Sequence, residues 1–305
     1  MRAKHAHGVF WGLVALVLLS GIVHAMQPAP RSAVNPQRIV SLAPATTEML
    51  FALGLGDRVV GVSSYCDYPP AVHAIPKVGG YYDPNYEAIV ALEPDLTILL
   101  TSHREIKTEL DQLGIRTLTT PHETVQDVHE AIRLIGSTCG AESAADSISR
   151  AIAARSQIAR RAVEGGERPR VLVCIGRDTE SGQLAGMYMA GRDGFYDELI
   201  RLAGGVNAYE DETVAYPQLS AEGVLQLNPD ILIDLVGDTV SGTKSADEIK
   251  GQWQQLPMLS AVRNNRVHLV VGYHALRPGP RYIEFLEQLA ALLHPDAFLE
   301  SAARD

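Results

Sequence analysis

Tyrosine side chains in loops are the residues of this sequence best suited to bind a ligand. The loop tyrosines are Tyr65, Tyr68, Tyr81, Tyr82, Tyr188, Tyr216 and Tyr273. Tyrosine combines a flat apolar ring with a polar tip, which suits a large ligand that has both kinds of surface. Nearly all of them adjoin predicted strands, where parallel α/β sheets place their ligand crevice. The pattern indicates a cleft shared by both halves of the chain, although each ring could also simply pack within its own loop.

One arginine could add a charge to such a cleft. Arg277 stands in the segment LRPGPR, where Pro278 and Pro280 restrict the backbone. A guanidinium held in this way is suited to a carboxylate or a phosphate. The alternative, a surface arginine that braces its loop, stays open.

A repeated segment contains two further charged candidates. Residues 86–100, YEAIVALEPDLTILL, match residues 221–235, AEGVLQLNPDILIDL, at an offset of 135. Each reads as a short helix, a Pro-Asp break and a buried strand. Glu87 and Glu222 fall in the first helical turn, where the helix dipole favours a carboxylate by roughly 0.3–1 kcal/mol. Their equivalent placement also suggests one docking carboxylate per lobe for a two-fold symmetric partner.

The catalytic motifs that would indicate an enzyme are missing from the sequence. There is no G-x-S-x-G elbow, H-E-x-x-H pair, P-loop or full G-x-G-x-x-G. His103, His122 and His129 are expected to be solvated rather than metal ligands. The sequence therefore predicts a protein that is not an enzyme and has no catalytic residues, resident metal or cofactor.

The elements that must position these residues alternate between strand and helix in both halves. This β-α-β order predicts an α/β fold with mostly parallel sheets and right-handed crossovers. Residues 141–163 contain no Gly or Pro and predict a helix roughly 35 Å long, which could be a strut between two lobes. We expect an N-terminal lobe over 38–138, a bridging helix over 139–166 and a C-terminal lobe over 167–305.

Composition and the N-terminus indicate an exported protein. A formal net charge of −10 over 305 residues argues against a nucleic-acid partner. Residues 1–25 carry a basic start and an apolar stretch of about 15 residues, which is short for a membrane span and predicts a cleaved signal peptide. Residues 26–37 are expected to be flexible. The three cysteines, Cys66, Cys139 and Cys174, support no pairing prediction.

Several segments together resemble the helical-backbone class of periplasmic substrate-binding proteins of ABC importers, which bind cobalamin, haem and ferric siderophores. They are RIVSLAPATTEMLFALGLGDRVVGVSSYCDYPP, the paired E-x-x-x-x-L-x-P-D segments, the central helix and RPGPRYIEFLEQLAALLHP. The resemblance covers residues 38–298 and is most specific to the cobalamin binders, through SSYxDYPP.

The resemblance implies two Rossmann-like lobes joined by one long backbone helix, little hinge motion and a ligand held between the lobes. It implies a monomer in the periplasm whose partners are a chelate ligand and a permease dimer, docked through Glu87 and Glu222. The positions that it implies as ligand contacts are Tyr65, Tyr81, Tyr216, Tyr273 and Arg277. Tyr82, a loop tyrosine next to Tyr81, is a further candidate for ligand binding. The sequence also departs from the cobalamin binders, since Tyr81 and Tyr216 replace tryptophans and Tyr273 replaces an acid.

The resemblance implies cobalamin or a related corrinoid as the ligand, with a ferric siderophore or haem as the alternative. From a different class of function, an exported α/β hydrolase such as an esterase remains the rival, although no nucleophile–base pair supports it.

Overall fold

The computed structural model describes residues 35–211, 214–237 and 244–297. The predicted signal peptide, nearly all of the predicted flexible segment and the last residues of the chain lie outside this part. From Pro36 onward the chain forms one compact unit. Among the residues that the structure describes, no helix is long and apolar enough to cross a membrane.

The first sheet is fully parallel, as the β-α-β order predicts. Its strands, in spatial order, are β2 (Val59–Val62), β1 (Ile39–Ser41), β3 (Leu96–Leu100) and β4 (Thr117–Thr120). Its helices are α2 (Pro44–Ala52), α3 (Tyr86–Ala91), α4 (Arg104–Gln112) and α5 (Val125–Cys139), with 3-10 turns η1 (Gly56–Arg58) and η2 (Pro70–Ala74). All five residues of β3 are buried, because helices cover both faces of a parallel sheet.

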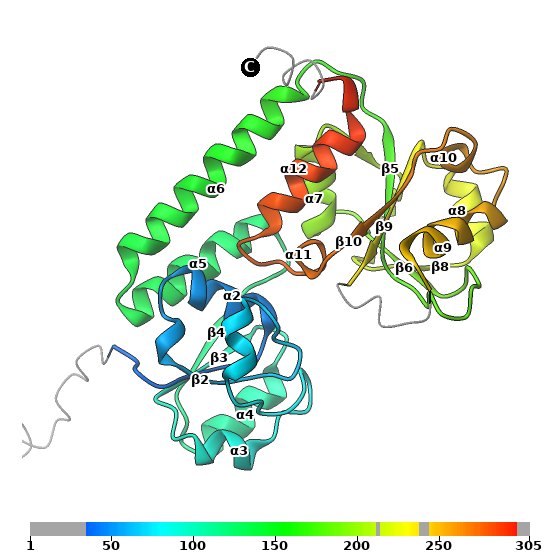
Figure 1. Cartoon of the computed structure of the whole chain (residues 1–305). Coiled ribbons are helices and arrows are strands. Elements are labelled where there is room, and N and C mark those ends of the chain that lie inside the picture. Colours follow the sequence, from blue (N-terminus) through cyan, green and yellow to red (C-terminus); the bar gives the residue numbers. More distant parts are fainter. Residues whose placement is uncertain (1–34, 212–213, 238–243, 298–305) are drawn as a thin grey trace, which may run out of the picture. The chain divides into compact units, whose positions relative to one another are not determined.

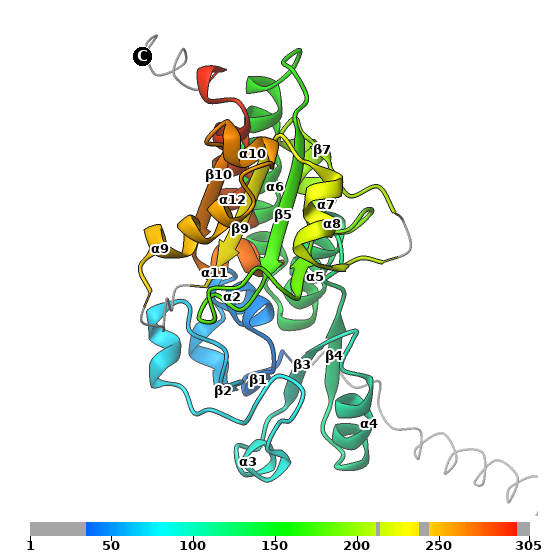
Figure 2. The same cartoon turned by 90° about the vertical axis from the view of Figure 1, so that its right-hand side faces the viewer.

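The second sheet is mixed. Its strands, in spatial order, are β10 (Val267–Val271), β9 (Ile231–Val236), β5 (Arg170–Gly176), β6 (Met187–Met189) and β8 (Gln218–Leu219), and β7 (Val206–Asn207) pairs with one end of β5. The strands β10, β9 and β5 are parallel neighbours, which Figure 2 shows side by side. The strands β6 and β8 are antiparallel additions that the sequence did not reveal. They span only two or three residues, too few for an alternating pattern to be recognised.

Short helices and one long helix complete the second half. They are α7 (Phe195–Leu202), α8 (Ala221–Leu227), α9 (Ala246–Gly251), η3 (Gln252–Gln255), α10 (Ser260–Arg263), α11 (Tyr273–Leu276) and α12 (Tyr282–Leu293). Fold class is therefore α/β, with two Rossmann-like lobes of mostly parallel sheet.

The long helix predicted between the halves is confirmed as α6 (Glu142–Ala162), which links the two lobes as their backbone helix. Its buried side chains Ala145, Ile152 and Ala159 are spaced by seven residues, or about two turns, and so share one face. This face packs on α5 and α12, and Figure 1 shows α6 and α12 side by side. The stripe is narrow, and the remaining faces of the helix are mainly exposed.

One hydrophobic core continues from lobe to lobe. It joins residues of the first sheet and α2 to residues of α5, α6, α7 and α12 and of the second sheet, with Ile132, Ile152, Phe195 and Phe285 among its buried members. Polar contacts accompany it, since the Val125 N–H at the start of α5 donates to Glu198 Oε2 on α7 over 3.0 Å. A continuous core of this kind opposes large movements of one lobe against the other, because opening would expose apolar surface.

The two copies of the repeated segment share one arrangement of hydrogen bonds, between the Asp of the Pro-Asp pair, an arginine and the end of the preceding helix. In the first lobe the Asp95 carboxylate accepts the backbone N–H of Arg38, and the Arg38 guanidinium donates to Leu92 O over 2.6 Å. In the second lobe Asp230 accepts the N–H of Arg170, whose guanidinium donates to Leu227 O over 2.8 Å.

The backbone conformation repeats as well. Glu93 and Asn228, which stand before the two Pro-Asp pairs, both have positive φ angles, of 45° and 42°. The Pro-Asp break therefore ends a helix and fastens the next strand in the same way twice.

Candidate ligand-binding site

A hollow of about 450 Å³ lies where the first sheet faces the segment between α11 and α12. Its lining residues are Ala43, Pro44, Ala45, Tyr65, Tyr81, Tyr82, Asp83, Leu100, His122, Leu276, Arg277 and Pro278. The volume is in the range of sites for small molecules and cofactors. Four of the six candidate ligand-binding residues, Tyr65, Tyr81, Tyr82 and Arg277, line this hollow.

The carboxyl ends of the first sheet position most of the lining. Ala43 follows β1, Tyr65 follows β2, Leu100 ends β3 and His122 follows β4. Since the strands are parallel, their carboxyl ends meet at one edge of the sheet, where this class of fold places its ligands. The sequence prediction of a crevice at this edge agrees with the position of the hollow.

Tyr81 is held in a cluster of rings. It packs edge-to-face on Tyr82 and on His103, with 4.6 Å between ring centroids in both pairs. Burial raises the pKa of Tyr81 to about 12, so the phenol is protonated at neutral pH. Tyr82 is largely exposed, with 72 % of its surface accessible, and forms the outer part of the cluster.

Two histidines behind the tyrosines correct the sequence-based expectation. His103 is buried rather than solvated, with 2 % of its surface accessible, and its Nε2 atom has no hydrogen-bond partner among the residues that the structure describes. Burial, reinforced by His122, lowers the pKa of His103 to about 4. His122 lines the hollow, and burial lowers its pKa as well. The expectation failed because His103 precedes α4, a position that looks like a surface loop in sequence.

His129, the third of these histidines, is also not solvated. It is half-buried on α5, and its Nε2 lies 3.1 Å from the Tyr282 hydroxyl on α12. This contact is another link between the lobes.

Among the described residues that line the hollow, Arg277 is the one arginine, and there is no lysine. Its guanidinium is already bound by the protein. It forms a bidentate pair with Asp67, at 2.5 Å to Oδ1 and 2.9 Å to Oδ2. Its Nη1 also donates to Glu48 Oε1 over 3.5 Å, and its Nη2 donates to Tyr65 O over 3.2 Å. The four N–H groups of the two terminal nitrogens therefore all have acceptors.

A second arginine completes an ionic network between the lobes. The buried carboxylate of Glu48 on α2 accepts two hydrogen bonds from Arg281, one from Nε over 2.9 Å and one from Nη2 over 2.8 Å. The Arg281 guanidinium also lies 3.7 Å from the centre of the Tyr68 ring. Although burial alone would raise the pKa of Asp67, the hydrogen bonds and charge of Arg277 hold it below its usual value. We call Glu48, Asp67, Arg277 and Arg281 the interlobe network.

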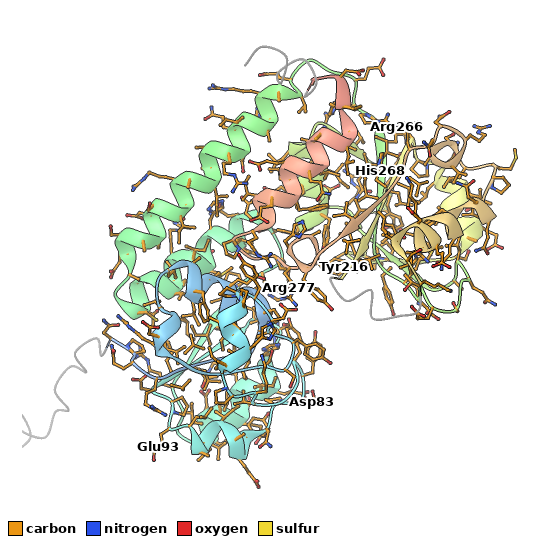
Figure 3. All side chains as sticks on the ribbon, viewed as in Figure 1. Asp83, Glu93, Tyr216, Arg266, His268 and Arg277 are labelled. Atoms are coloured by element: carbon orange, nitrogen blue, oxygen red, sulfur yellow. The ribbon has the colours of Figure 1, made fainter. Side chains whose placement is uncertain are left out.

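The two remaining tyrosines implied as ligand contacts lie beside the hollow rather than in its lining. Tyr273 lies under Arg277, with 4.3 Å between its ring centre and the guanidinium carbon. Tyr216, from the segment before β8, is close enough for its phenol to influence the pKa of Tyr81. Figure 3 labels Tyr216 and Arg277 at the junction of the two lobes. Tyr216 is 45 % exposed, so its ring is accessible.

Neither Glu87 nor Glu222 lines the hollow. Each is exposed in the first turn of its helix, α3 or α8. The helix caps are also equivalent, because Asn85 Oδ1 accepts the Ala88 N–H and Ser220 Oγ accepts the Gly223 N–H.

The lining of the hollow is mainly aromatic and apolar. Within the described residues, it contains no Ser, Thr, Cys or Lys side chain. Cys66, Cys139 and Cys174 are all free thiols buried in the lobes. Tyrosine rings, apolar side chains and a guanidinium occupied by carboxylates form a surface for a flat, partly apolar ligand.

Comparison with known proteins identifies the family. Residues 39–270, well over half of the chain, match the family described as "Periplasmic binding protein". The chain belongs to this family. Its two-lobed fold and long backbone helix place it among the helical-backbone periplasmic binding proteins of ABC importers.

Three known proteins illustrate what the chain is similar to. An ABC transporter substrate-binding lipoprotein of Bacillus subtilis, YvrC, described as uncharacterized, is 32% identical over 87% of this chain and 82% of its own length. The vitamin B12-binding protein of Vibrio cholerae is 30% identical over 84% of this chain and 89% of its own. The solved structure of the periplasmic heme-binding protein RhuT from Roseiflexus sp. RS-1 has a TM-score of 0.71 at 27% identity, over 86% of this chain and 99% of its own.

Family membership fixes the general role. Proteins of this family bind their substrates outside the cytoplasm. They work with a permease in the membrane, which transports the substrate.

Proposed function

We propose that this protein captures cobalamin or a related corrinoid in the hollow and delivers it to an ABC permease. The observation that carries the proposal is the position of Tyr65, Tyr81 and Tyr82 in one hollow at the carboxyl ends of the first sheet. A corrin macrocycle is flat and partly apolar and has amide groups at its edge, and tyrosine rings suit both kinds of surface. The vitamin B12-binding relative supports the same ligand class.

Haem or a ferric siderophore is the alternative ligand. It is favoured by the presence of both Tyr81 and His122 in the lining, because phenolate and imidazole groups are ligands of iron. Against it, burial disfavours the phenolate form of Tyr81.

The direct test is native mass spectrometry of the mature protein purified from its host, followed by titration with cyanocobalamin and with haemin. The proposal expects a bound corrinoid, and a one-to-one complex with cyanocobalamin. A complex with haemin alone, whose Soret band changes when Tyr81 is replaced by Phe, would instead support the alternative.

Delivery is proposed to use Glu87 and Glu222 as docking groups, one per lobe, for the two halves of the permease. We further propose that the protein acts as a monomer in the periplasm after removal of residues 1–25, with lobes over 38–138 and 167–305. N-terminal sequencing of the periplasmic form should begin at or near Met26. An intact Met1 in the membrane fraction would contradict cleavage.

A further inference from the structure

The balance of charge at the hollow bears on whether the ligand of the proposed function carries carboxylate groups. The interlobe network contains two carboxylates, Glu48 and Asp67, and two guanidinium groups, Arg277 and Arg281, so its formal charge is zero. The positive charge that faces the hollow is therefore balanced before any ligand arrives.

The geometry of Arg277 makes this balance difficult to change. Its terminal N–H groups donate to Asp67, Glu48 and Tyr65 O, and the Tyr273 ring covers one face of the guanidinium. The Arg277 side chain is only 11% exposed. A ligand carboxylate that paired with the two terminal nitrogens of Arg277 would have to displace Asp67, which would leave the Asp67 charge in a partly buried place without its partner.

Among the described residues that line the hollow, the other ionisable groups do not attract an anion. Asp83 is exposed in the lining and carries a negative charge, so it repels a carboxylate. His122 is neutral at pH 7, because burial lowers its pKa. The adjoining hollow contains Arg104, but Glu123 and Asp127 line the same space.

We propose that Glu48 and Asp67 make the cleft selective for a chelate without carboxylate groups, such as a corrinoid whose edge carries amides. By occupying Arg277 and Arg281, the two acids remove the groups that would otherwise bind the propionates of a haem or the carboxylates of a siderophore. This inference rests on the proposed function, because it assumes that the ligand lies in the hollow lined by Tyr81 and Arg277.

The test compares ligands that differ by one charge. The probes are cyanocobalamin and its monocarboxylic acid, in which one edge amide is hydrolysed to a carboxylate. The full-length mature protein should bind the amide form more tightly by about 10-fold or more, which is about 1.4 kcal/mol or more, because the like-charge contact of the acid is uncompensated. Equal affinities, or a preference for the acid, would overturn the proposal.

Asp67→Asn isolates the cause. This nearly isosteric change leaves the network with one excess positive charge at Arg277, and the preference for the amide ligand should shrink by about 10-fold. Asp57→Asn is the matched control, because Asp57 is exposed at the far end of α2 from Pro44 and does not line the hollow. The control should keep the wild-type ratio of affinities. An unchanged ratio in folded Asp67→Asn protein would contradict the role assigned to Asp67.

The outcomes separate this inference from the proposed function. If Asp67→Asn does not fold, as circular dichroism would show, the wild-type ratio still decides. If the wild type binds neither corrinoid, the proposed ligand is wrong. Carboxylate exclusion is then tested by comparing the affinities for haemin and for its diamide, which lacks the carboxylates. A preference for the diamide would then support carboxylate exclusion, and a preference for haemin would overturn it.

Discussion

Tyr81 shows how a single binding residue can be prepared by its neighbours. The edge-to-face contacts with Tyr82 and His103 fix the ring before a ligand arrives. A ring that is already ordered loses less side-chain entropy on binding, so more of the contact free energy remains as affinity. The buried His103 therefore supports the site without lining the hollow.

Replacing Tyr81 or Tyr216 by Ala should weaken binding of cyanocobalamin by about 1–3 kcal/mol, because each change removes a large aromatic contact surface. Isothermal titration calorimetry measures the effect, and circular dichroism should stay native. Tyr188→Ala is the control, since Tyr188 is 49 % exposed on β6 and does not line the hollow. If neither Tyr81→Ala nor Tyr216→Ala changes affinity for corrinoid, haemin or siderophore, the ligand binds elsewhere.

Residue types and loop positions singled out the tyrosines and Arg277 as candidates, but they did not reveal the partners of Arg277. Asp67 and Glu48 lie 210 and 229 residues away from it in the chain. No local pattern marks two acids as partners over such a separation, because the pairing exists only once the lobes are packed together. The isolation of Arg277 in sequence made it look available to a ligand.

At the scale of the elements, α6 shows which contacts stabilise the junction. Arg155 on α6 and Glu287 on α12 form a bidentate pair at 2.8 and 2.7 Å, but their side chains are 44% and 40% exposed. Ile152, one turn earlier, is only 4% exposed and belongs to the continuous core. Water and salt screen the ion pair, whereas the core contact depends on burial.

Ile152→Ala should therefore lower the free energy of unfolding by about 2–5 kcal/mol, while Arg155→Ala should lower it by about 1 kcal/mol or less. Urea denaturation followed by circular dichroism measures both. Adding 0.5 M salt should reduce the Arg155 effect and leave the Ile152 effect nearly unchanged. Equal losses in the two variants would mean that the ion pair, rather than the core, holds α6 to α12.

The sequence predicted long and regular elements better than short ones. Helix α6 was visible because residues 141–163 contain no helix breaker, and its observed bounds differ by one residue at each end. The paired strands β3 and β9 were visible as buried apolar runs after Pro-Asp. In contrast, β6, β8 and α11 have at most four residues each, and packing rather than local preference determines such short elements.

For the whole molecule, one buried histidine and four half-buried ones link stability to pH. Burial lowers the pKa of all five of them below the usual value of 6.5, and that of His103 to about 4. They are His103, His122, His129, His268 and His294. Unfolding restores ordinary values, so below about pH 6.5 the unfolded chain binds more protons than the folded one. Stability is therefore greatest above this pH and falls as the pH decreases.

The free energy of unfolding should decline between pH 6.5 and 4, and His103 alone can contribute up to about 3 kcal/mol. Urea titrations at several pH values measure the decline. His103→Asn should make the decline shallower, whereas His73→Asn, a change of an exposed histidine, should not. Carboxylates such as Asp67, whose pKa is lowered, become protonated and lose their ion pairs only at still lower pH. A flat profile down to pH 4.5 would contradict the coupling.

The exposed glutamates of the repeat allow ligand binding to be separated from delivery. Glu87 and Glu222 occupy the same position of α3 and α8, and neither lines the hollow. The double change Glu87→Lys with Glu222→Lys should leave affinity for cyanocobalamin unchanged. It should reduce uptake of radiolabelled cyanocobalamin by cells, because lysines would now face the basic groups expected on the permease. The single changes should be intermediate.

The matched control for this experiment is Glu105→Lys with Glu142→Lys. These glutamates are also exposed in the first turns of their helices, α4 and α6. Replacing each by lysine therefore loses the same favourable interaction with the helix dipole, roughly 0.3–1 kcal/mol, as the changes at Glu87 and Glu222. Uptake should stay normal in this control if docking is specific to the repeat. Association of the wild-type protein with membrane vesicles that contain the permease should also weaken as salt is added, since exposed charge pairs are screened. Normal uptake by the Glu87/Glu222 double variant would leave these residues only their role in stabilising the helix N-termini.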